Sequence, residues 1–337
     1  MIVTEFYDGQ GLGNQLWVYV TLRSLAAKNG FSFGVKSPEK FKGIDIFDID
    51  FGETVVGGCS PEGGPPISLP EKINVYIKES QIYENNTSLN VTPADPRLLN
   101  ISDHTKFDGT CQSLEYIIEP KQNVSKWLSL RSSITSGCEV DFDVCVVHVR
   151  GGDYLNTYSF LPRQYYENAM SSMKKKYPGI RFVAVTDDLE YCKGILPNIK
   201  IIGSSPSSRR DSFRAAHHLG GSILDDFLIL NGARYVILSA STFSFWAAYL
   251  NPNKPFVMAP KYWFSFSKSD GWWSTPGCIV PDWVYLDRSG LICDGIKCLI
   301  DKKTSNCSPV MRSNKIRSGL FRIQRKISKI LSPYWIP

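Results

Sequence analysis

A histidine, an arginine and an aspartate follow an apolar run near the middle of the chain. Residues 144–147 predict a buried strand, and His148, Arg150 and Asp153 come after it, with two glycines before the aspartate. An arginine presents a planar donor fork that binds two phosphate oxygens, and a glycine-rich turn after a buried strand is a common ligand site in α/β proteins. The spacing therefore favours an anion site; a surface turn held by an Arg–Asp ion pair is the alternative.

Polar residues also follow two later apolar runs, 181–185 and 235–238. They are Asp187 and Asp188 after the first run, and Ser241, Thr242 and Ser244 after the second. Hydroxyls and free amides at the start of a helix suit phosphate. The two aspartates and Ser241 have helix capping as the alternative role.

The elements that must position these groups alternate between strand and helix. Strands are expected at 144–147, 181–185, 199–202 and 235–238, and helices at 162–177, 189–194, 223–231 and 245–250. Such alternation predicts a parallel sheet with right-handed crossovers, and the carboxyl ends of parallel strands share one edge. The three polar groups are therefore expected on one edge, which favours a nucleotide site.

The start of the chain repeats this arrangement. A strand pattern at 2–7 leads through a glycine loop into a helical pattern at 16–27 and then a second strand. The loop contains Gly11, Gly13 and Asn14. The helix start exposes amides that suit an anion. The loop is not the dinucleotide-binding fingerprint, because the third glycine is misplaced and no acidic residue closes the second strand; a tight turn is the alternative.

The stretch 36–140 shows no such periodicity. It is rich in Pro, Gly and Asn, so we expect long surface loops that complete a first domain, with short helices at 113–118 and 127–134. Two Asp-x-Asp triplets, at 48–50 and 141–143, resemble the metal-binding pairs of some sugar transferases. The second triplet precedes a strand and favours a turn, so no metal site is expected.

Length and composition limit the number of domains and the kinds of protein that the sequence can form. The 337 residues, 43% of them hydrophobic, suffice for two domains. No apolar run is long enough to span a membrane, and residues 1–6 predict a strand rather than a signal peptide. We therefore expect a cytoplasmic protein; the Golgi lumen is the alternative if an N-terminal anchor precedes this sequence.

Nine cysteines are widely spread, with no CxxC pair. Cys145 lies inside the central strand and is expected to be a small core residue. Cys278, Cys293, Cys298 and Cys307 cluster late and could bridge in an oxidising compartment, with reduced thiols as the alternative.

The net charge of +6 belongs to the C-terminal tail. Residues 302–337 carry nine Lys or Arg and no Asp or Glu, so the rest is near neutral and nucleic-acid binding is not expected. One helical stripe of the tail is apolar, which predicts a basic amphipathic helix in peripheral contact with an anionic membrane. A helix packed on the body and a disordered basic tail are the alternatives. The stripe consists of Ile316, Leu320, Ile323, Ile327 and Leu331.

Five segments resemble the α-1,2-fucosyltransferases, an inverting family (glycosyltransferase family 11) that makes H-type blood-group structures and some bacterial O-antigens. Gly11–Gln15 is similar to the family's N-terminal Gly-x-Gly-Asn-Gln, and 148–154 resembles its His-x-Arg-Arg-Gly-Asp-Tyr. Thr186–Asp188, 226–250 and 281–284 are similar to its later motifs.

The resemblance implies a GT-B-like α/β fold, with two Rossmann-type domains facing a cleft. Residues 1–140 would form the acceptor side, 141–300 the GDP-sugar-binding domain and 301–337 the basic tail. The implied reaction moves L-fucose from GDP-β-L-fucose to the 2-hydroxyl of a galactose residue on a glycan, in α-1,2 linkage, with no metal and no cofactor. Transfer from another GDP-sugar and glycan binding without catalysis are the alternatives.

The resemblance also implies roles for the polar residues. The catalytic set is Arg150, Asp153 and Asn14, and the donor-binding set is His148, Asp188, Ser241, Thr242, Ser244, Gly11 and Gly13. Arg150 would stabilise the negative charge on the leaving phosphate, while His148 and Asp188 would recognise the nucleoside. The acceptor hydroxyl needs a base. Asp153 and Asp8 are the candidates, although Asp153 could instead be a structural partner of Arg150.

Gly151 departs from the family pattern, because most members have a second arginine there. Either Arg150 suffices, or donor affinity is weaker, or another cation supplies the charge. The candidate cations are Lys193, Arg209, Arg210 and Lys261. If the pocket has room, Gly151→Arg is expected to keep or raise donor affinity.

Overall fold

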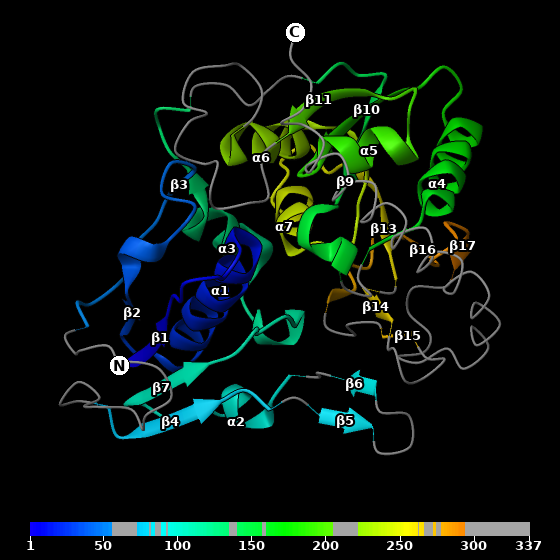
Figure 1. Cartoon of the computed structure of the whole chain (residues 1–337). Helices are drawn as coiled ribbons and strands as arrows, with labels where there is room; N and C mark the ends of the chain where they lie inside the picture. The colour runs from blue at the N-terminus through cyan, green and yellow to red at the C-terminus, as the bar shows by residue number, and fades with distance from the viewer. Residues whose placement is uncertain are drawn as a thin grey trace, which may run out of the picture.

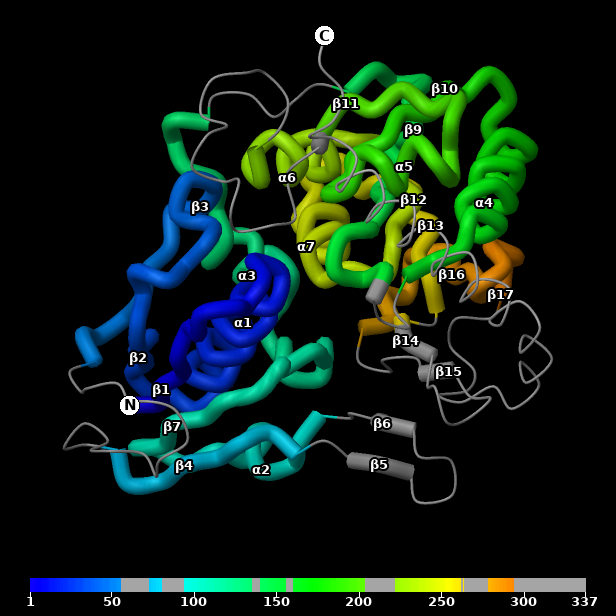
Figure 2. The backbone as a smooth tube through the Cα atoms, in the orientation of Figure 1, coloured from blue at the N-terminus to red at the C-terminus, as the bar shows by residue number. Residues whose placement is uncertain are grey.

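Two parallel β-sheets lie side by side, with helices packed between them (Figure 1). The computed structural model describes residues 1–55, 73–80, 82–84, 89–91, 94–134, 140–156, 160–204, 222–261, 263–265, 272–273 and 278–293. Figure 2 follows the backbone from the first sheet, in blue and cyan, to the second, in green through orange. This is the GT-B-like α/β architecture that the family resemblance implies.

The first sheet has the order β2-β1-β7-β4, with every strand parallel to its neighbours. Its strands are β1 (Ile2–Glu5), β2 (Phe33–Lys36), β4 (Val75–Lys78) and β7 (Thr105–Asp108). Helix α1 (Leu12–Asn29) connects β1 to β2 and ends at Gly30, whose φ of 67° is the left-handed cap that glycine favours. β4 and β7 lie in the stretch expected to be irregular, so that expectation is wrong there.

The second sheet has the order β11-β10-β9-β12-β13-β16-β17 and is parallel except for β17. Its strands are β9 (Val144–Val149), β10 (Arg181–Thr186), β11 (Lys200–Ser204), β12 (Tyr235–Ile237), β13 (Phe256–Pro260), β16 (Val284–Leu286) and β17 (Ile292–Cys293). The helices that alternate with them are α4 (Arg163–Lys176), α5 (Leu189–Ile195), α6 (Ile223–Gly232) and α7 (Thr242–Tyr249). The predicted alternation is confirmed, and β9 is buried along its whole length.

The other described elements are short. They are η1 (Pro38–Lys40), β3 (Phe47–Asp48), β5 (Ile82–Glu84), β6 (Leu89–Val91), α2 (Pro96–Leu99), η2 (Leu114–Tyr116), α3 (Lys121–Trp127), β8 (Ser129–Leu130), η3 (Gly152–Asn156), β14 (Phe264–Ser265) and β15 (Trp272–Trp273). The helix expected at 113–118 is only the 3₁₀ turn η2. The helix expected at 127–134 is wrong, because the chain leaves α3 there and pairs with β3 as strand β8.

The second Asp-x-Asp triplet is a turn at the amino end of β9. Arg181 makes ion pairs with Asp141 at 2.9 Å and with Asp143 at 2.7 Å. Both carboxylates are therefore already used, on the edge of the sheet opposite the expected ligand site.

One hydrophobic core spans both sheets. The ring of Trp17, from α1, lies 4.9 Å from the rings of both Phe245 and Trp246 in α7, and the two tryptophans are fully buried. The same core contains Ile2 of β1 and Val146 of β9. Burial of each large apolar side chain is worth about 1.5–3 kcal/mol, so this packing fixes α1 against α7.

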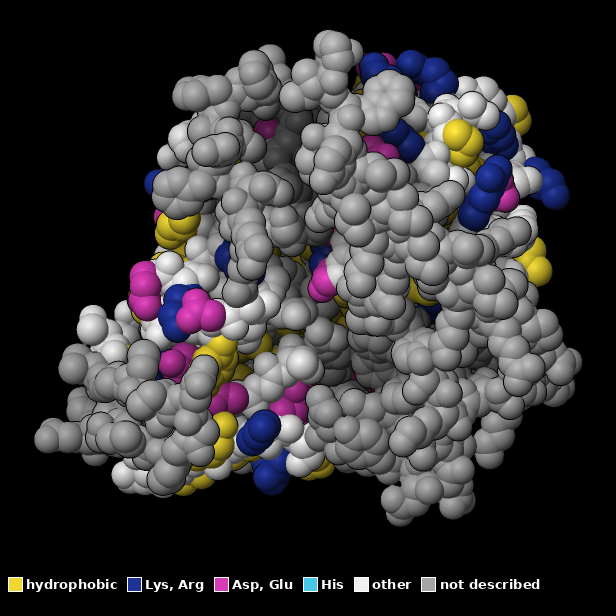
Figure 3. Space-filling view, in the orientation of Figure 1, with side chains coloured by type: hydrophobic (Ala, Val, Ile, Leu, Met, Phe, Trp, Pro, Cys, Tyr) yellow, Lys and Arg dark blue, Asp and Glu magenta, His cyan; other side chains and the backbone are white. Residues whose placement is uncertain are grey.

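The described surface carries both signs of charge. Figure 3 shows basic and acidic side chains intermixed on the described part of one face, in keeping with a near-neutral body. Within the described ranges, no helix has the length and apolar character to cross a membrane. Cys145 is a buried core residue as expected, and no disulfide joins Cys278 to Cys293. Residues 294–337, which include Cys298, Cys307 and the expected amphipathic helix, lie outside the described residues.

Candidate nucleotide-sugar site

The candidate site lies where the carboxyl edges of the two sheets meet. β9 pairs in parallel with β10 on one side and with β12 on the other. This register places residues 148–153, 187–188 and 239–244 along one edge, which confirms that expectation. Helix α1 begins after β1 and α7 begins after β12, so the amino ends of both helices face this edge (Figure 1).

Arg150 is held between two carboxylates at the end of β9. One guanidinium nitrogen lies 2.7 Å from Asp153 Oδ1 and another lies 2.6 Å from Asp187 Oδ2. The arginine is 27% exposed, Asp153 is 71% exposed and Asp187 is 8% exposed. An anion that reaches Arg150 would therefore displace the exposed Asp153 more easily than the buried Asp187.

The two aspartates after β10 fold the glycine turn onto the sheet. Asp187 Oδ1 accepts a hydrogen bond from the Gly151 amide at 2.7 Å, and burial raises the pKa of Asp187 even though Arg150 lowers it. Asp188 caps α5 by accepting from the Tyr191 amide, and its other oxygen accepts from the Gly152 amide, both at 3.1 Å. The capping alternative is therefore confirmed for Asp188. A nucleoside that binds Asp188 would have to share one of its carboxylate oxygens with these backbone amides.

Gly151 has no room for a side chain. A Cβ atom at this position would lie 2.6 Å from Asp188 Cβ and 2.9 Å from the Tyr191 ring. The space that Gly151→Arg requires is absent, so the condition under which this substitution was expected to keep or raise donor affinity is not met in this chain. The proximity of Asp188 to the turn, which the sequence alone does not reveal, is the reason.

Among the cations named as substitutes, Lys261 directly follows β13 and is buried at the carboxyl edge of the same sheet. Lys193 is exposed on α5. Arg209 and Arg210 lie outside the described residues.

His148 is a neutral imidazole buried at the end of β9. Its Nδ1 lies 2.6 Å from the Ser239 hydroxyl, and its ring is 6.1 Å from that of Phe243. Burial, together with the charge of Arg150, lowers the pKa of His148 to about 3. Sequence reasoning missed Ser239, although it precedes Ser241 by two residues in the loop after β12.

The neutral state of His148 gives a pH-dependent stability. Between about pH 6.5 and 3 only the unfolded chain binds this proton, so the free energy of unfolding falls as pH drops, by up to about 1.4 kcal/mol per unit. We expect His148→Asn to remove this contribution. Urea unfolding of both proteins at pH 7, 6 and 5 measures it, and equal slopes would contradict the assignment.

The glycine loop brings α1 against the start of α7. Asn14 Oδ1 accepts hydrogen bonds from Thr242 Oγ1 at 2.9 Å and from Gln112 Nε2 at 3.1 Å. A Cβ at Gly13 would overlap the carbonyl carbon of Thr242 and lie 2.6 Å from Oγ1, whereas Gly11 faces open space. The first turns of the two helices are therefore in contact. Gln112 could not be found from the sequence, because it follows β7, far away in the chain.

The remaining predicted residues, Ser244, Ser241 and Asp8, differ in whether their side chains already bind other groups of the chain. The Ser244 hydroxyl donates to the Ser241 carbonyl at 3.2 Å, inside the first turn of α7, and is fully buried. The Ser241 side chain makes no capping bond and is almost buried. Asp8 is 81% exposed and lies 3.0 Å from Lys40. Ser241 therefore offers a hydroxyl at this edge, whereas Ser244 is already used.

The residues at this edge of the second sheet lie within a segment that matches a known protein family. The model of "Glycosyl transferase family 11" matches residues 118–287. Alpha-1,2-colitosyltransferase from Escherichia coli is 26% identical over 171 residues, which are 47% of this chain and 56% of that protein. Galactoside 2-alpha-L-fucosyltransferase Sec1 from Mus musculus is 30% identical over 128 residues, which are 33% of this chain and 32% of that protein. The chain thus spans about half, or less, of these relatives.

The solved structures that match this chain include fucosyltransferase NodZ from Bradyrhizobium, with a TM-score of 0.38 and 17% identity over 74% of this chain and 93% of that one. A mutant of Arabidopsis thaliana FUT1 in complex with GDP has a TM-score of 0.45 and 11% identity over 80% of this chain and 72% of that one. The family match covers half of the chain and includes His148, Arg150 and the start of α7, so the chain belongs to glycosyl transferase family 11.

Proposed function

We propose that this protein transfers L-fucose from GDP-β-L-fucose to the 2-hydroxyl of a galactose residue on a glycan, with inversion, to give an α-1,2 linkage. The observation that carries the proposal is the position of Arg150, a partly exposed guanidinium at the sheet edge beside the start of α7, within the family match. The names of several relatives, galactoside α-1,2-fucosyltransferases, support fucose as the transferred sugar and a galactoside as the acceptor.

The proposed chemistry follows from the charges. Negative charge grows on the leaving diphosphate, and Arg150 takes up that charge together with the amides at the start of α7. A diphosphate that draws Arg150 away from Asp153 leaves the Asp153 carboxylate free, so Asp153 is our first choice for the base that deprotonates the acceptor hydroxyl. Asp8 is the second choice. His148 contacts the nucleoside as a neutral ring, oriented by Ser239.

We propose that this reaction needs no metal ion. Three of the four carboxylates in the two Asp-x-Asp triplets make ion pairs within the chain: Arg181 binds Asp141 and Asp143, and Asp50 lies 3.4 Å from Arg23. Across the described part of the chain, no group of three His, Cys, Asp or Glu side chains is placed to hold a metal. Transfer is therefore expected to continue in excess EDTA. Loss of turnover in EDTA that Mn²⁺ restores would contradict this.

A second candidate is transfer of a sugar other than fucose. It is favoured by the Escherichia coli relative, whose name gives colitose, and by Gly151, which removes a cation from the motif. Glycan binding without catalysis is the further alternative. Peripheral membrane contact through residues 301–337 and a cytoplasmic location remain predictions of the sequence.

A donor panel tests the proposal. The protein is incubated with a galactose-terminated disaccharide and, separately, GDP-fucose, GDP-colitose, GDP-mannose or UDP-galactose, and the product linkage is read by NMR. We expect fucose at the 2-position of galactose as the main product. A larger yield from another donor would favour the second candidate, and no transfer from any donor would favour the binding protein.

A further inference from the structure

The side-chain amide of Asn14 has a fixed orientation at the junction of α1 and α7. Its Oδ1 accepts hydrogen bonds from both Gln112 Nε2 and Thr242 Oγ1. Nδ2 must therefore face away from these two donors, and no acceptor among the described residues lies against it. A half-buried N–H group beside two helix starts is suited to an anionic oxygen.

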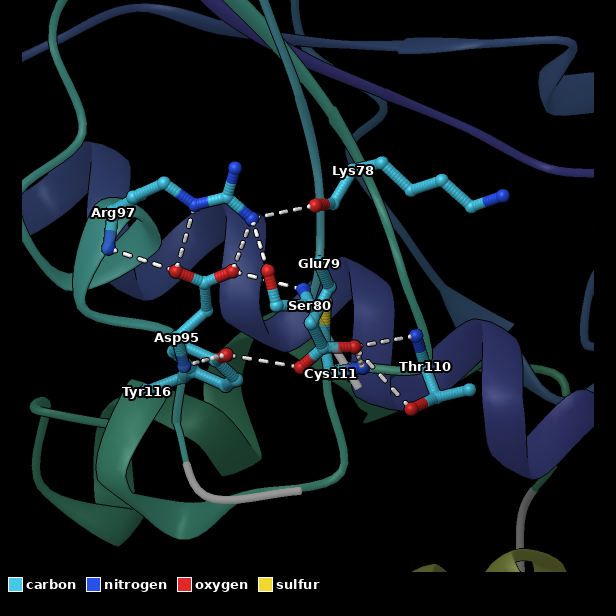
Figure 4. Close-up of polar contacts among 8 residues, drawn as sticks. All are labelled: Lys78, Glu79, Ser80, Asp95, Arg97, Thr110, Cys111 and Tyr116. Carbon is cyan, nitrogen blue, oxygen red and sulfur yellow. Dashed lines mark hydrogen bonds and ion pairs between the residues drawn. The ribbon is translucent and has the colours of Figure 1, made fainter. Parts of the chain in front are cut away.

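Figure 4 shows the Glu79 carboxylate bound to Thr110 and Cys111, the two residues that precede Gln112 in its loop. One oxygen of this buried carboxylate accepts from the amides of Thr110 and Cys111, at 2.8 and 2.9 Å. The other oxygen accepts from the Tyr116 hydroxyl at 2.9 Å. The Thr110 hydroxyl also donates to the first oxygen, at 3.3 Å, so four donors from two segments fix the backbone directly before Gln112.

The shape of this loop is also costly to maintain. Cys111 has a φ of 49°, in the left-handed region that non-glycine residues seldom adopt. A Cβ at Gly109 would lie 2.5 Å from Glu79 Oε2, so only glycine lets the loop approach the carboxylate. Strained backbone of this kind persists only where the surrounding structure enforces it, and it gathers near functional sites.

We propose that Gln112 is a positioning residue: it fixes the Asn14 amide so that Nδ2 donates to a diphosphate oxygen of the bound donor nucleotide. The inference rests on the proposed function, because it takes the nucleotide from there. Asn14 is the residue that touches the ligand, Gln112 acts through Asn14, and Glu79 holds the loop of Gln112 in place.

GDP binding, measured by calorimetric titration, tests the inference. Gln112→Glu removes the donor in nearly the same shape, so the Asn14 amide should turn over and the dissociation constant of GDP should rise about tenfold. The Asn14→Asp side chain still accepts hydrogen bonds from Gln112 and Thr242 but has no N–H group. This variant should therefore keep the melting temperature of the wild type and weaken GDP binding at least as much as Gln112→Glu does. In the Asn14→Ala background, Gln112→Ala should have almost no further effect, because interacting residues are not additive.

The matched control is Gln164→Glu on α4. There, Gln164 Nε2 donates to Asn168 Oδ1 at 3.0 Å, which is the same pair of groups on an exposed surface. This variant should bind GDP like the wild type. If Gln112→Glu binds GDP as tightly as the wild type, the inference is overturned and the proposed function still stands. The same holds if the effects of Gln112→Ala and Asn14→Ala on the dissociation constant add. If the wild type binds no GDP, the proposed function fails and the inference with it.

Discussion

Replacing Arg150 by alanine is expected to lower kcat/KM for fucose transfer by about 10²–10³-fold, which corresponds to roughly 3–4 kcal/mol of lost transition-state stabilisation. The reason is the position of its guanidinium, which two carboxylates hold at the sheet edge while leaving it partly exposed. Arg150→Lys should also lose most activity, because an ammonium cannot offer two parallel donors. Because it keeps a positive charge beside the buried Asp187, it is the cleaner variant.

Arg181→Ala is the matched control for Arg150. Arg181 also bridges two carboxylates, Asp141 and Asp143, but it does so at the amino end of β9. Initial rates and circular dichroism of the three variants should show normal folding for all, with activity lost only at position 150. A folded Arg150→Ala enzyme with a near-normal rate would remove Arg150 from the site.

Gly13→Ala is expected to destabilise the protein by about 3 kcal/mol, the upper end of the usual cost of overpacking. The added methyl group would overlap the backbone of Thr242, and neither helix can move without disturbing the buried contact of Trp17 with Phe245. Urea unfolding at pH 7 measures the loss. The hydrogen bond between Asn14 and Thr242 should be lost with it, so GDP binding should weaken as well.

Gly11→Ala supplies the comparison within the same loop. A Cβ there would meet nothing within 4 Å, and the residue has an extended backbone with φ of −73°. Its stability should stay within about 0.5 kcal/mol of the wild type, as is usual for surface changes. Similar losses for Gly11→Ala and Gly13→Ala would show that the loop tolerates no side chain anywhere, and that the contact with α7 is not the cause.

Four strands of the second sheet, β9 to β12, could be predicted from the sequence because they are apolar runs that alternate with helical segments, whereas β13, β16 and β17 were not predicted. Half of the first sheet could not be predicted either. β4 is exposed at Val75, Tyr76 and Lys78, and β7 alternates buried residues with Lys106 and Asp108. These short strands owe their conformation to pairing with each other and with β1, and local periodicity does not report such pairing.

The candidate site, too, could be predicted from the sequence only in part. Arg150 and Asp187 could be predicted, because each directly follows a recognisable strand. The position of Asp188 against Gly151 could not, because it depends on the register between β9 and β10. Gln112 reaches Asn14 only through the fold of the first sheet, because the two residues are 98 positions apart in the chain.

Nucleotide binding by the wild-type protein is the most direct test of the central claim, that this sheet edge binds GDP through Arg150 without a metal. Thermal unfolding is recorded with GDP, UDP, CDP and ADP, each with and without EDTA. Since a ligand at 100 times its dissociation constant stabilises the folded state by about 2.7 kcal/mol, saturating GDP should raise the melting temperature by several degrees. The other nucleotides should do less, EDTA should change nothing, and Arg150→Ala should lose the shift. A larger shift with UDP, or a GDP shift that survives in Arg150→Ala or disappears in EDTA, would contradict the account.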